Sequence, residues 1–235
     1  MTIDIATRKD VFSLAEASLN SPVLVIGLGR FGAAVALTLA ERGQEVMAID
    51  SDMTKIQYFA DRLTHAVQSD STDEEALRQL GVNEFQRAVV AIGSAVEASV
   101  LTTSLLVDLA VPEIWAKAIS REHGRILERI GAHQVVYPEA DMGERVAHLV
   151  SSGMLDYIEF DADFALAKLR APNSLGTGAL GGLGLRARSG VTVVGVKEPG
   201  RDFTYADRET VIEPGALIAV AGPREAVDRF ARETP

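Results

Sequence analysis

The 235-residue sequence contains no cysteine, and this absence narrows its chemistry. Without cysteine the chain has no disulfide framework, no thiolate nucleophile and no cysteine-ligated zinc site. Basic residues are also few, since 23 Lys and Arg stand against 33 Asp and Glu and give a formal net charge of −10. Such a charge repels a phosphate backbone unless the basic residues cluster, and they do not. Nucleic acid is therefore disfavoured as a partner.

Long apolar runs are missing as well. A membrane-spanning helix needs ~18–20 consecutive apolar residues, whereas the longest candidates, such as Ala33–Ala40, have the length of one helix face. We therefore expect a chain that does not itself cross a membrane. Residues 1–20 are not typical of a cleaved secretory signal, because Asp4, Asp10 and Glu16 interrupt them. We interpret them as a cytosolic extension and leave open whether it is disordered.

From Pro22 onward, short runs rich in β-branched residues alternate with longer segments whose apolar residues recur every three or four positions. The expected strands are Val23–Ile26, Glu45–Ile49, His65–Gln68, Arg87–Ile92, Ile114–Ile119 and Gln134–Tyr137. The expected helices are Phe31–Arg42, Thr54–Leu63, Asp73–Leu80, Ala95–Leu109 and Arg121–Ile130. Regular alternation of this kind predicts an α/β fold, with a Rossmann-like doubly wound parallel sheet over residues 21–138.

After Pro138 the regular alternation stops. The helical pattern Glu139–Val150 runs into Ser151-Ser152-Gly153, so residues 139–153 are expected to form a crossover helix and linker. Residues 154–235 predict a second, smaller α+β domain. Its expected elements are strands Phe164–Leu169, Val191–Val196 and Ala216–Ala221, a short helix in a glycine-rich stretch, and a closing helix Arg224–Arg232. The domain contains no His and no Cys, which leaves it poor in groups for acid–base chemistry.

A glycine-rich motif follows the first expected strand. The residues Gly27-Leu28-Gly29-Arg30-Phe31-Gly32 fit G-x-G-x-x-G, a pattern that means little without its context. Here it follows a strand, opens an apolar helix and precedes a second strand that ends in Asp50. Gly27 then permits the tight turn, Gly29 lets a phosphate come close, and Gly32 lets helix and strand pack together. These conditions together predict a dinucleotide-type phosphate loop.

Asp50 is the expected ribose ligand. At the carboxyl end of the second strand it can accept hydrogen bonds from both ribose hydroxyls, and its charge would repel a 2′-phosphate. Adenosine-type ligands are therefore favoured over NADP. The alternative is that the glycines and Asp50 only shape a turn. The same glycine spacing recurs at Gly176–Gly181, but no strand precedes it, so we interpret it as a flexible connection.

Two basic residues stand out near the expected phosphates. Arg30 lies inside the glycine motif, where its guanidinium could clamp a terminal phosphate, or could simply be solvated. Lys117 is a lone lysine within Ile114–Ile119. Burial of Lys117 in a parallel sheet is costly unless an anion meets it. A phosphate is one such anion, and a surface position on an edge strand is the alternative.

Several of these segments together resemble the regulator-of-potassium-conductance (RCK) family, in particular the regulatory subunits of Ktr and Trk potassium-uptake systems. The resemblance rests on Val25–Gly32, Ala48–Asp50, Val89–Gly93, Ile114–Ala118 and Ile130–Glu139. In the second domain, Leu185–Gly195 resembles the start of the family's C-terminal (TrkA-C) domain. The resemblance covers about residues 22–235.

The resemblance implies a bound nucleotide, ADP or ATP and in some members NAD(H). The residues it places at this site are Gly27, Gly29, Arg30, Phe31, Gly32, Asp50, Ser51, Asp70, Ser71, Ala91, Gly93 and Lys117. By the same resemblance Arg30 reaches the phosphates of a nucleotide held mainly by a neighbouring subunit. Glu139 corresponds to a Mg²⁺ or Ca²⁺ ligand near a dimer axis, which a carboxylate suits. The alternative is an acid that complements the helix dipole in a first turn.

The implied assembly is an octameric ring built from dimers, peripheral at the cytoplasmic face of the cell membrane. Its partner would be a multi-span membrane cation translocator of the KtrB/TrkH type, and no chemistry on the nucleotide is required. Some members bind cyclic di-AMP in the second domain, but here Gly176–Gly184 departs from the polar helix expected before Arg186. An NAD-dependent oxidoreductase and a free-standing soluble nucleotide sensor are the alternatives from other classes.

Overall fold

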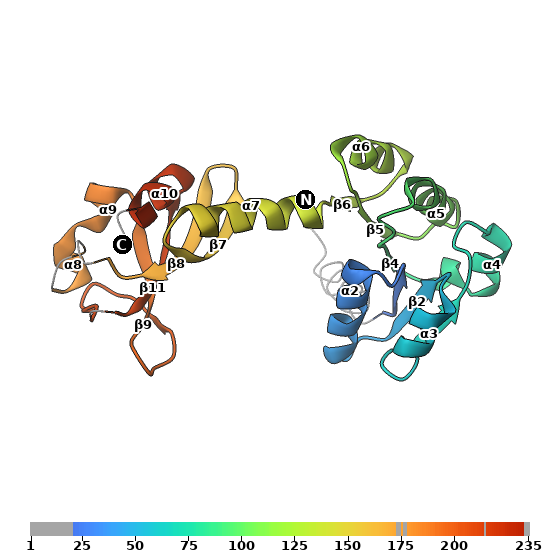
Figure 1. Ribbon diagram of the computed structural model, residues 1–235, viewed down its shortest axis with the longest axis horizontal. Helices are drawn as coiled ribbons and strands as arrows, with labels where there is room; N and C mark the ends of the chain where they lie inside the picture. The colour runs from blue at the N-terminus through green and yellow to red at the C-terminus, as the bar shows by residue number, and fades with distance from the viewer. Residues whose placement is uncertain (1–20, 173–174, 176–177, 214, 233–235) are drawn as a thin grey trace, which may run out of the picture. The chain divides into compact units, whose positions relative to one another are not determined.

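The computed structural model describes residues 21–172, 175, 178–213 and 215–232 (Figure 1). The expected N-terminal extension, together with Gly176 and Thr177 of the glycine-rich stretch, lies outside the described residues. The chain divides into two compact units, with the boundary between Glu139 and Ala140. Each unit has a sheet and a buried core of its own.

The first unit is built on a six-stranded parallel sheet in the order β3-β2-β1-β4-β5-β6. Its strands are β1 (Val23–Ile26), β2 (Val46–Asp50), β3 (His65–Gln68), β4 (Arg87–Val90), β5 (Glu113–Lys117) and β6 (Gln134–Val136). Strand β1 pairs with β2 on one side and with β4 on the other, so the winding of the chain reverses between β1 and β4. This order confirms the predicted doubly wound sheet. Loops diverge at such a reversal and leave a crevice at the carboxyl ends of the strands.

Helices cover both faces of this sheet. They are α2 (Arg30–Glu41), α3 (Met53–Phe59), α4 (Glu74–Gln79), α5 (Val96–Asp108) and α6 (Arg121–Ile130), with a 3₁₀ turn η1 (Val82–Glu84). Helices α2 and α3 contribute Ala36 and Phe59 to one buried cluster. Leu106 of α5 and Leu127 of α6 belong to the other. Alternate residues of β1 enter the two clusters, as a strand covered on both faces requires.

The second unit carries a five-stranded antiparallel sheet in the order β10-β9-β11-β8-β7. Its elements after α7 (Pro138–Ser151) are β7 (Met154–Asp161), β8 (Phe164–Arg170), α8 (Leu180–Leu183), α9 (Leu185–Ser189), β9 (Thr192–Lys197), β10 (Thr204–Tyr205), β11 (Leu217–Pro223) and α10 (Arg224–Arg232). Phe230 of α10 packs with Leu169 and Ile218 in the core of this unit. The expected α+β architecture and the closing helix are confirmed.

Strands β7 and β10 were not expected from the sequence. Strand β7 lies at one edge of the sheet and buries only Met154 and Tyr157, while most of its other residues are exposed. Strand β10 has two residues. The apolar residues of β7 do not alternate strictly with polar ones, and β10 is too short to show a pattern, so periodicity does not reveal either strand.

Helix α7 lies almost entirely in the second unit, because only its first two residues precede the boundary. His148 of this helix stacks on Tyr157 of β7, with ring centroids 4.2 Å apart. The compact unit therefore contains His148, whereas residues 154–235 contain no histidine. Within the described ranges, no helix combines the length and the apolar character needed to cross a membrane.

Candidate functional site

A cleft with a volume of about 250 Å³ opens where the strands of the first unit end. The predicted residues that line it are Gly27, Gly29, Asp50, Ser51, Asp70, Ser71, Ala91 and Gly93. Asp50 is the last residue of β2, and the others come from the loops that follow β1, β2, β3 and β4. The structure thus brings together residues from four separate loops at the reversal point of the sheet, where α/β folds place their ligands.

The glycine loop after β1 owes its shape to two of its three glycines. Gly27 has a φ of 97°, in the left-handed region that glycine adopts without strain. A Cβ on Gly32 would stand 1.9 Å from the carbonyl oxygen of Gly27, so no larger residue fits there. A Cβ on Gly29 would have no neighbour within 4 Å. Gly29 is therefore not required by the fold of the loop, and its lack of a side chain leaves open space beside the start of α2.

Two helices begin at the cleft without a side-chain cap. Gly29 is the N-cap residue of α2 and Ala95 that of α5, and neither residue has a side chain that accepts a backbone N–H. In contrast, Asp52, Asp73 and Ser120 cap α3, α4 and α6. The first N–H groups of a helix have no intrahelical acceptor, and the helix dipole is positive there. The two uncapped ends are thus suited to bind an anion in the cleft.

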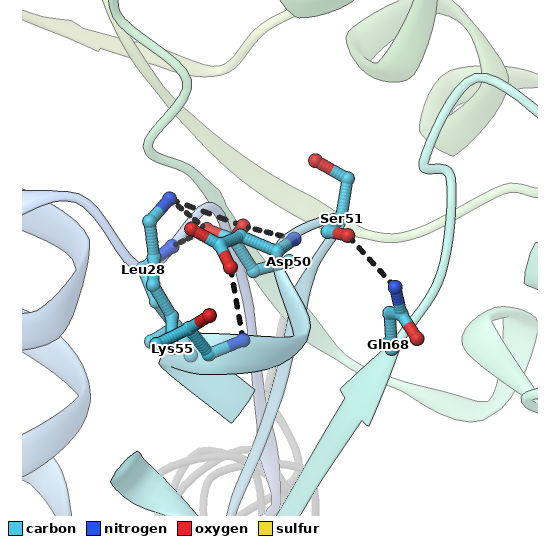
Figure 2. A network of polar contacts seen from close by, with 7 residues as sticks. Leu28, Asp50, Ser51, Lys55 and Gln68 are labelled. Atoms are coloured by element: carbon cyan, nitrogen blue, oxygen red, sulfur yellow. Dashed lines mark hydrogen bonds and ion pairs between the residues drawn. The ribbon is translucent and has the colours of Figure 1, made fainter. Parts of the chain in front are cut away.

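Asp50 stands at the centre of a polar network (Figure 2). Its Oδ2 accepts a hydrogen bond of 2.6 Å from the backbone N–H of Leu28, and its Oδ1 accepts one of 2.9 Å from that of Asp52. The Lys55 ammonium lies 3.1 Å from Oδ1 and 2.9 Å from Oδ2. Asp50 therefore ties the glycine loop to the start of α3.

The charge of Asp50 is stabilised inside this network. Burial alone would raise the pKa of the Asp50 carboxyl, but the N–H of Asp52, the Lys55 ammonium and the N–H of Leu28 outweigh burial, so the pKa is lowered. The pairing with Lys55 also offsets the negative charge that was expected to repel a 2′-phosphate. We therefore expect weaker discrimination against NADP than a lone carboxylate would give.

The other polar residues of the cleft form hydrogen bonds with neighbouring residues. Asp70 accepts hydrogen bonds from the N–H and hydroxyl of Thr72, which lower the pKa of its carboxyl. The Ser71 hydroxyl lies 2.8 Å from that of Thr102 in α5. The carbonyl of Ser51 accepts a hydrogen bond from Gln68 (Figure 2). Asp70 and Ser71 thus line the cleft and have polar partners that the sequence did not reveal.

Arg30, Phe31, Gly32 and Lys117 do not line the cleft itself. Lys117 lies next to the cleft, because its Nζ would be 3.2 Å from a Cβ on Gly93 and is 5.9 Å from the ring centre of Phe31. Strand β5 runs between β4 and β6, and Lys117 is only 8% exposed, so the alternative of a surface position on an edge strand is wrong. The anion that meets Lys117 is the carboxylate of Glu139.

The Nζ of Lys117 and Oε1 of Glu139 are 2.6 Å apart. The hydrogen bond from Lys117, above all, lowers the pKa of the Glu139 carboxyl, and the charge of the exposed Arg30 contributes. Glu139 is the second residue of α7, so its position also suits an acid in the first turn. The residue predicted to bind phosphate and the residue predicted to bind a metal thus contact each other.

Lys55 and Ser94 also line the cleft, although neither was expected there from the sequence. Lys55 lies in the first turn of α3, five positions after Asp50. The close spacing of a lysine and the expected ribose ligand was a signal that could have revealed this residue. Ser94 lies in the loop between β4 and α5, and its type carries no comparable signal.

A second cavity, of about 500 Å³, lies within the second unit. Leu185, Arg186, Asp207 and Arg208 are among the residues that line it. Leu185 and Arg186 belong to the segment that resembles the start of the C-terminal domain. Two arginines would favour an anionic ligand in this cavity.

Comparison with known proteins finds a separate domain family for each part of the chain. Residues 23–138 match the TrkA-N domain family and residues 179–234 match the TrkA-C domain family. The chain is 40% identical to Ktr system potassium uptake protein C of Bacillus subtilis, over 88% of this chain and 94% of that protein. It is 35% identical to Ktr system potassium uptake protein A of the same organism, over 91% and 97%.

Among solved structures, the RCK domain of GsuK resembles this fold with a TM-score of 0.64 and 21% identity. The match covers 92% of this chain and 48% of that chain, so this chain spans about half its length. A second GsuK structure, of the channel bound to NAD, has the same TM-score at 20% identity and covers 92% and 40%.

Proposed function

Because this chain belongs to the family of the Ktr system potassium uptake proteins A and C, we propose that it is a nucleotide-sensing regulatory subunit of a potassium uptake system. The observation that carries the proposal is the cleft at the reversal of the first sheet, where the uncapped starts of α2 and α5 meet. These helix starts suit phosphate groups. Asp50 and Lys55 suit a ribose at the end of β2.

The ligands we propose are ADP and ATP, with NAD(H) as a further ligand. A GsuK channel has been solved with NAD bound, and its RCK domain has the fold described above. The side chains that line the described cleft include no histidine, tyrosine or cysteine, and its carboxylates and lysine are engaged locally, Asp50 with Lys55 and Asp70 with Thr72. We therefore propose binding without chemistry, in preference to an oxidoreductase.

A switch between ADP and ATP needs a group that senses the γ-phosphate, because a ligand shifts a conformational equilibrium only through its different affinity for the two states. Arg30 is our candidate. It is exposed at the first position of α2, beside the pair of Lys117 and Glu139. We propose that it contacts the terminal phosphate across a subunit interface, so that one added phosphate charge changes how two subunits fit together.

We propose that the Mg²⁺ or Ca²⁺ site forms between two subunits, each of which supplies one carboxylate ligand. In the part of the chain that the structure describes, no group of three or more His, Cys, Asp or Glu residues could hold a metal ion. Glu139 is 60% exposed in its side chain, and Lys117 contacts only its Oε1. A second copy of Glu139, related by a two-fold axis, would complete a carboxylate pair that suits these cations. If so, Mg²⁺ raises the thermal stability of the ATP-bound protein and Glu139→Gln abolishes the increase.

The proposed partner is a multi-span membrane cation translocator, bound at the cytoplasmic face of the membrane by a ring of these subunits. The names of the Bacillus relatives, which are potassium uptake proteins, support a transport partner. Cyclic di-AMP is a weaker candidate ligand for the cavity beside Arg186 and Arg208, where two guanidinium groups could meet its phosphates.

The test compares ADP and ATP affinities, measured by calorimetry, in wild type and Arg30→Ala. Loss of a charged hydrogen bond to phosphate costs roughly 1.5–3 kcal/mol, or about one to two decades of affinity. We expect this loss for ATP, a smaller loss for ADP, and loss of ATP control over cation flux through the co-reconstituted membrane subunit. Arg42→Ala, at the exposed opposite end of α2, is the matched control.

One outcome would contradict nucleotide binding itself, and another would contradict only the role of Arg30. If the wild-type protein binds neither ADP, ATP nor NAD, the proposed function fails. If it binds them, but Arg30→Ala keeps both the ATP/ADP ratio and the ATP control of flux, Arg30 is not the sensor.

A further inference from the structure

We propose that Lys55 determines ribose specificity at the cleft, by donating a hydrogen bond from its ammonium to a ribose hydroxyl of the bound nucleotide. This inference rests on the proposed function, because it assumes an adenine nucleotide in the cleft. It differs from the sequence expectation, in which the Asp50 carboxylate alone accepts hydrogen bonds from both hydroxyls.

The carboxylate of Asp50 has little capacity left to accept further hydrogen bonds. A carboxylate offers about four lone-pair sites. Each oxygen of Asp50 already receives one backbone N–H, from Leu28 or Asp52, and one contact from Lys55 (Figure 2). A ribose that donated to Asp50 would have to displace one of these donors. The backbone donors belong to the glycine loop and to the start of α3, so Lys55 is the only one of the three with a flexible chain.

Lys55, in contrast, has an N–H donor that its contacts with Asp50 do not use. A lysine ammonium carries three N–H groups, and its contacts with the two oxygens of Asp50 use at most two of them. Lys55 lines the cleft, and its side chain is 40% exposed, whereas that of Asp50 is 6% exposed. The third N–H can therefore meet a ligand without breaking the ion pair. Asp50 then acts as an anchor that orients the ammonium at the end of β2.

The consequence is a reversed hydrogen-bond polarity at the ribose. In the expected arrangement a hydroxyl donates to a carboxylate, whereas in the proposed arrangement a hydroxyl oxygen accepts from an ammonium. The two arrangements predict opposite effects of removing Lys55. If Lys55 donates to the ribose, its loss weakens binding. If the ribose must displace Lys55 from Asp50, its loss strengthens binding.

The experiment measures affinities for ADP, 2′-deoxy-ADP and 3′-deoxy-ADP by calorimetry in the full chain. In wild type we expect at least one deoxy nucleotide to bind about tenfold more weakly than ADP, as expected for loss of one charged hydrogen bond. In Lys55→Met this difference falls below about twofold, and ADP itself binds about tenfold more weakly. Lys55→Arg keeps a donor near Asp50 and should restore part of the difference.

Lys197→Met, in the second unit and outside the cleft lining, is the matched control and should bind all three nucleotides as wild type does. Thermal melts without nucleotide check that each variant is folded. Tighter ADP binding by Lys55→Met would overturn the inference, as would a deoxy effect that persists in that variant or that is missing from wild type. Failure of wild type to bind ADP at all would instead contradict the proposed function.

Discussion

The glycine motif allows a sharp test, because two of its glycines have different reasons to lack a side chain. We predict that Gly29→Ala keeps the fold and loses the nucleotide, whereas Gly32→Ala damages the fold. The backbone of Gly29 has φ −72° and ψ −175°, which alanine adopts freely, and its Cβ would have no neighbour within 4 Å. The new methyl group at Gly29 would instead lie in the open space where a phosphate is expected to reach the start of α2.

The expected magnitudes follow from these surroundings. A glycine replaced by alanine in a compatible conformation gains about 0.4–1 kcal/mol of stability, so the Tm of unliganded Gly29→Ala should be unchanged or slightly raised. A Cβ on Gly32 would lie 1.9 Å from the oxygen of Gly27 and 2.8 Å from the Cβ of Ala91. The first neighbour is backbone and cannot rotate away. Overpacking of this kind costs about 1–3 kcal/mol or more, which corresponds to a Tm lower by several degrees.

The assay combines thermal melts without ligand with calorimetric titration of ADP. For Gly29→Ala we expect a wild-type Tm and ADP affinity reduced at least about tenfold, since charged hydrogen bonds between N–H groups and phosphate are each worth roughly 1.5–3 kcal/mol. For Gly32→Ala we expect the lower Tm with or without a change in binding. Wild-type ADP affinity in Gly29→Ala would refute the view that the start of α2 receives the phosphates. A wild-type Tm in Gly32→Ala would refute the steric argument.

Two further predictions concern the charged pairs. Glu139→Gln removes the carboxylate that pairs with Lys117, whose side chain is only 10% exposed, and should lower the free energy of unfolding in urea by roughly 1–3 kcal/mol. Lys117→Met leaves Glu139, whose side chain is 60% exposed, in contact with water and should cost less. The double variant should recover part of the loss, and equal costs for the two single variants would contradict the assignment of Lys117 as the buried partner. The second prediction concerns pH: because the pKa of Asp50 is lowered on folding, its stabilisation is fully present above the unfolded pKa, near 4, and is lost as the pH falls through the lower folded value. The difference in unfolding free energy between wild type and Asp50→Asn should therefore shrink below about pH 4, and a difference that grows there would contradict the lowered pKa.

Many strands and helices of the first unit could be predicted from the local pattern of apolar and turn-forming residues. Strand β1, Val23–Ile26, was predicted to the residue, because four apolar residues are bounded by Pro22 and Gly27. Strand β5 ends at Lys117 rather than at Ile119, because its pairing with β6 extends only to that residue. The end of a strand depends on how far its neighbour continues, and no local pattern carries this information.

The sequence predicted that certain polar residues would have interaction partners, but not which residues those partners are. The sequence indicated that Asp50 could accept hydrogen bonds from the ribose hydroxyls, and that a buried Lys117 would require an anion. The spacing of Lys55 from Asp50 suggests that the two residues are close, but their contact depends on how α3 starts after the Asp52 cap. Hydrogen bonds of this kind depend on backbone direction over a few residues, which composition and periodicity do not fix.

The contact between Lys117 and Glu139 follows from the register of two strands, which the sequence pattern alone does not give. Strand β6 runs parallel to β5, with Val136 beside Lys117. Helix α7 begins two residues later, at Pro138, so its first turn must start next to the end of β5. Glu139 therefore reaches Lys117 although 22 positions separate them. This contact joins the ammonium expected to bind phosphate to the carboxylate expected to bind a cation, so a ligand at either group changes the charge that faces the other.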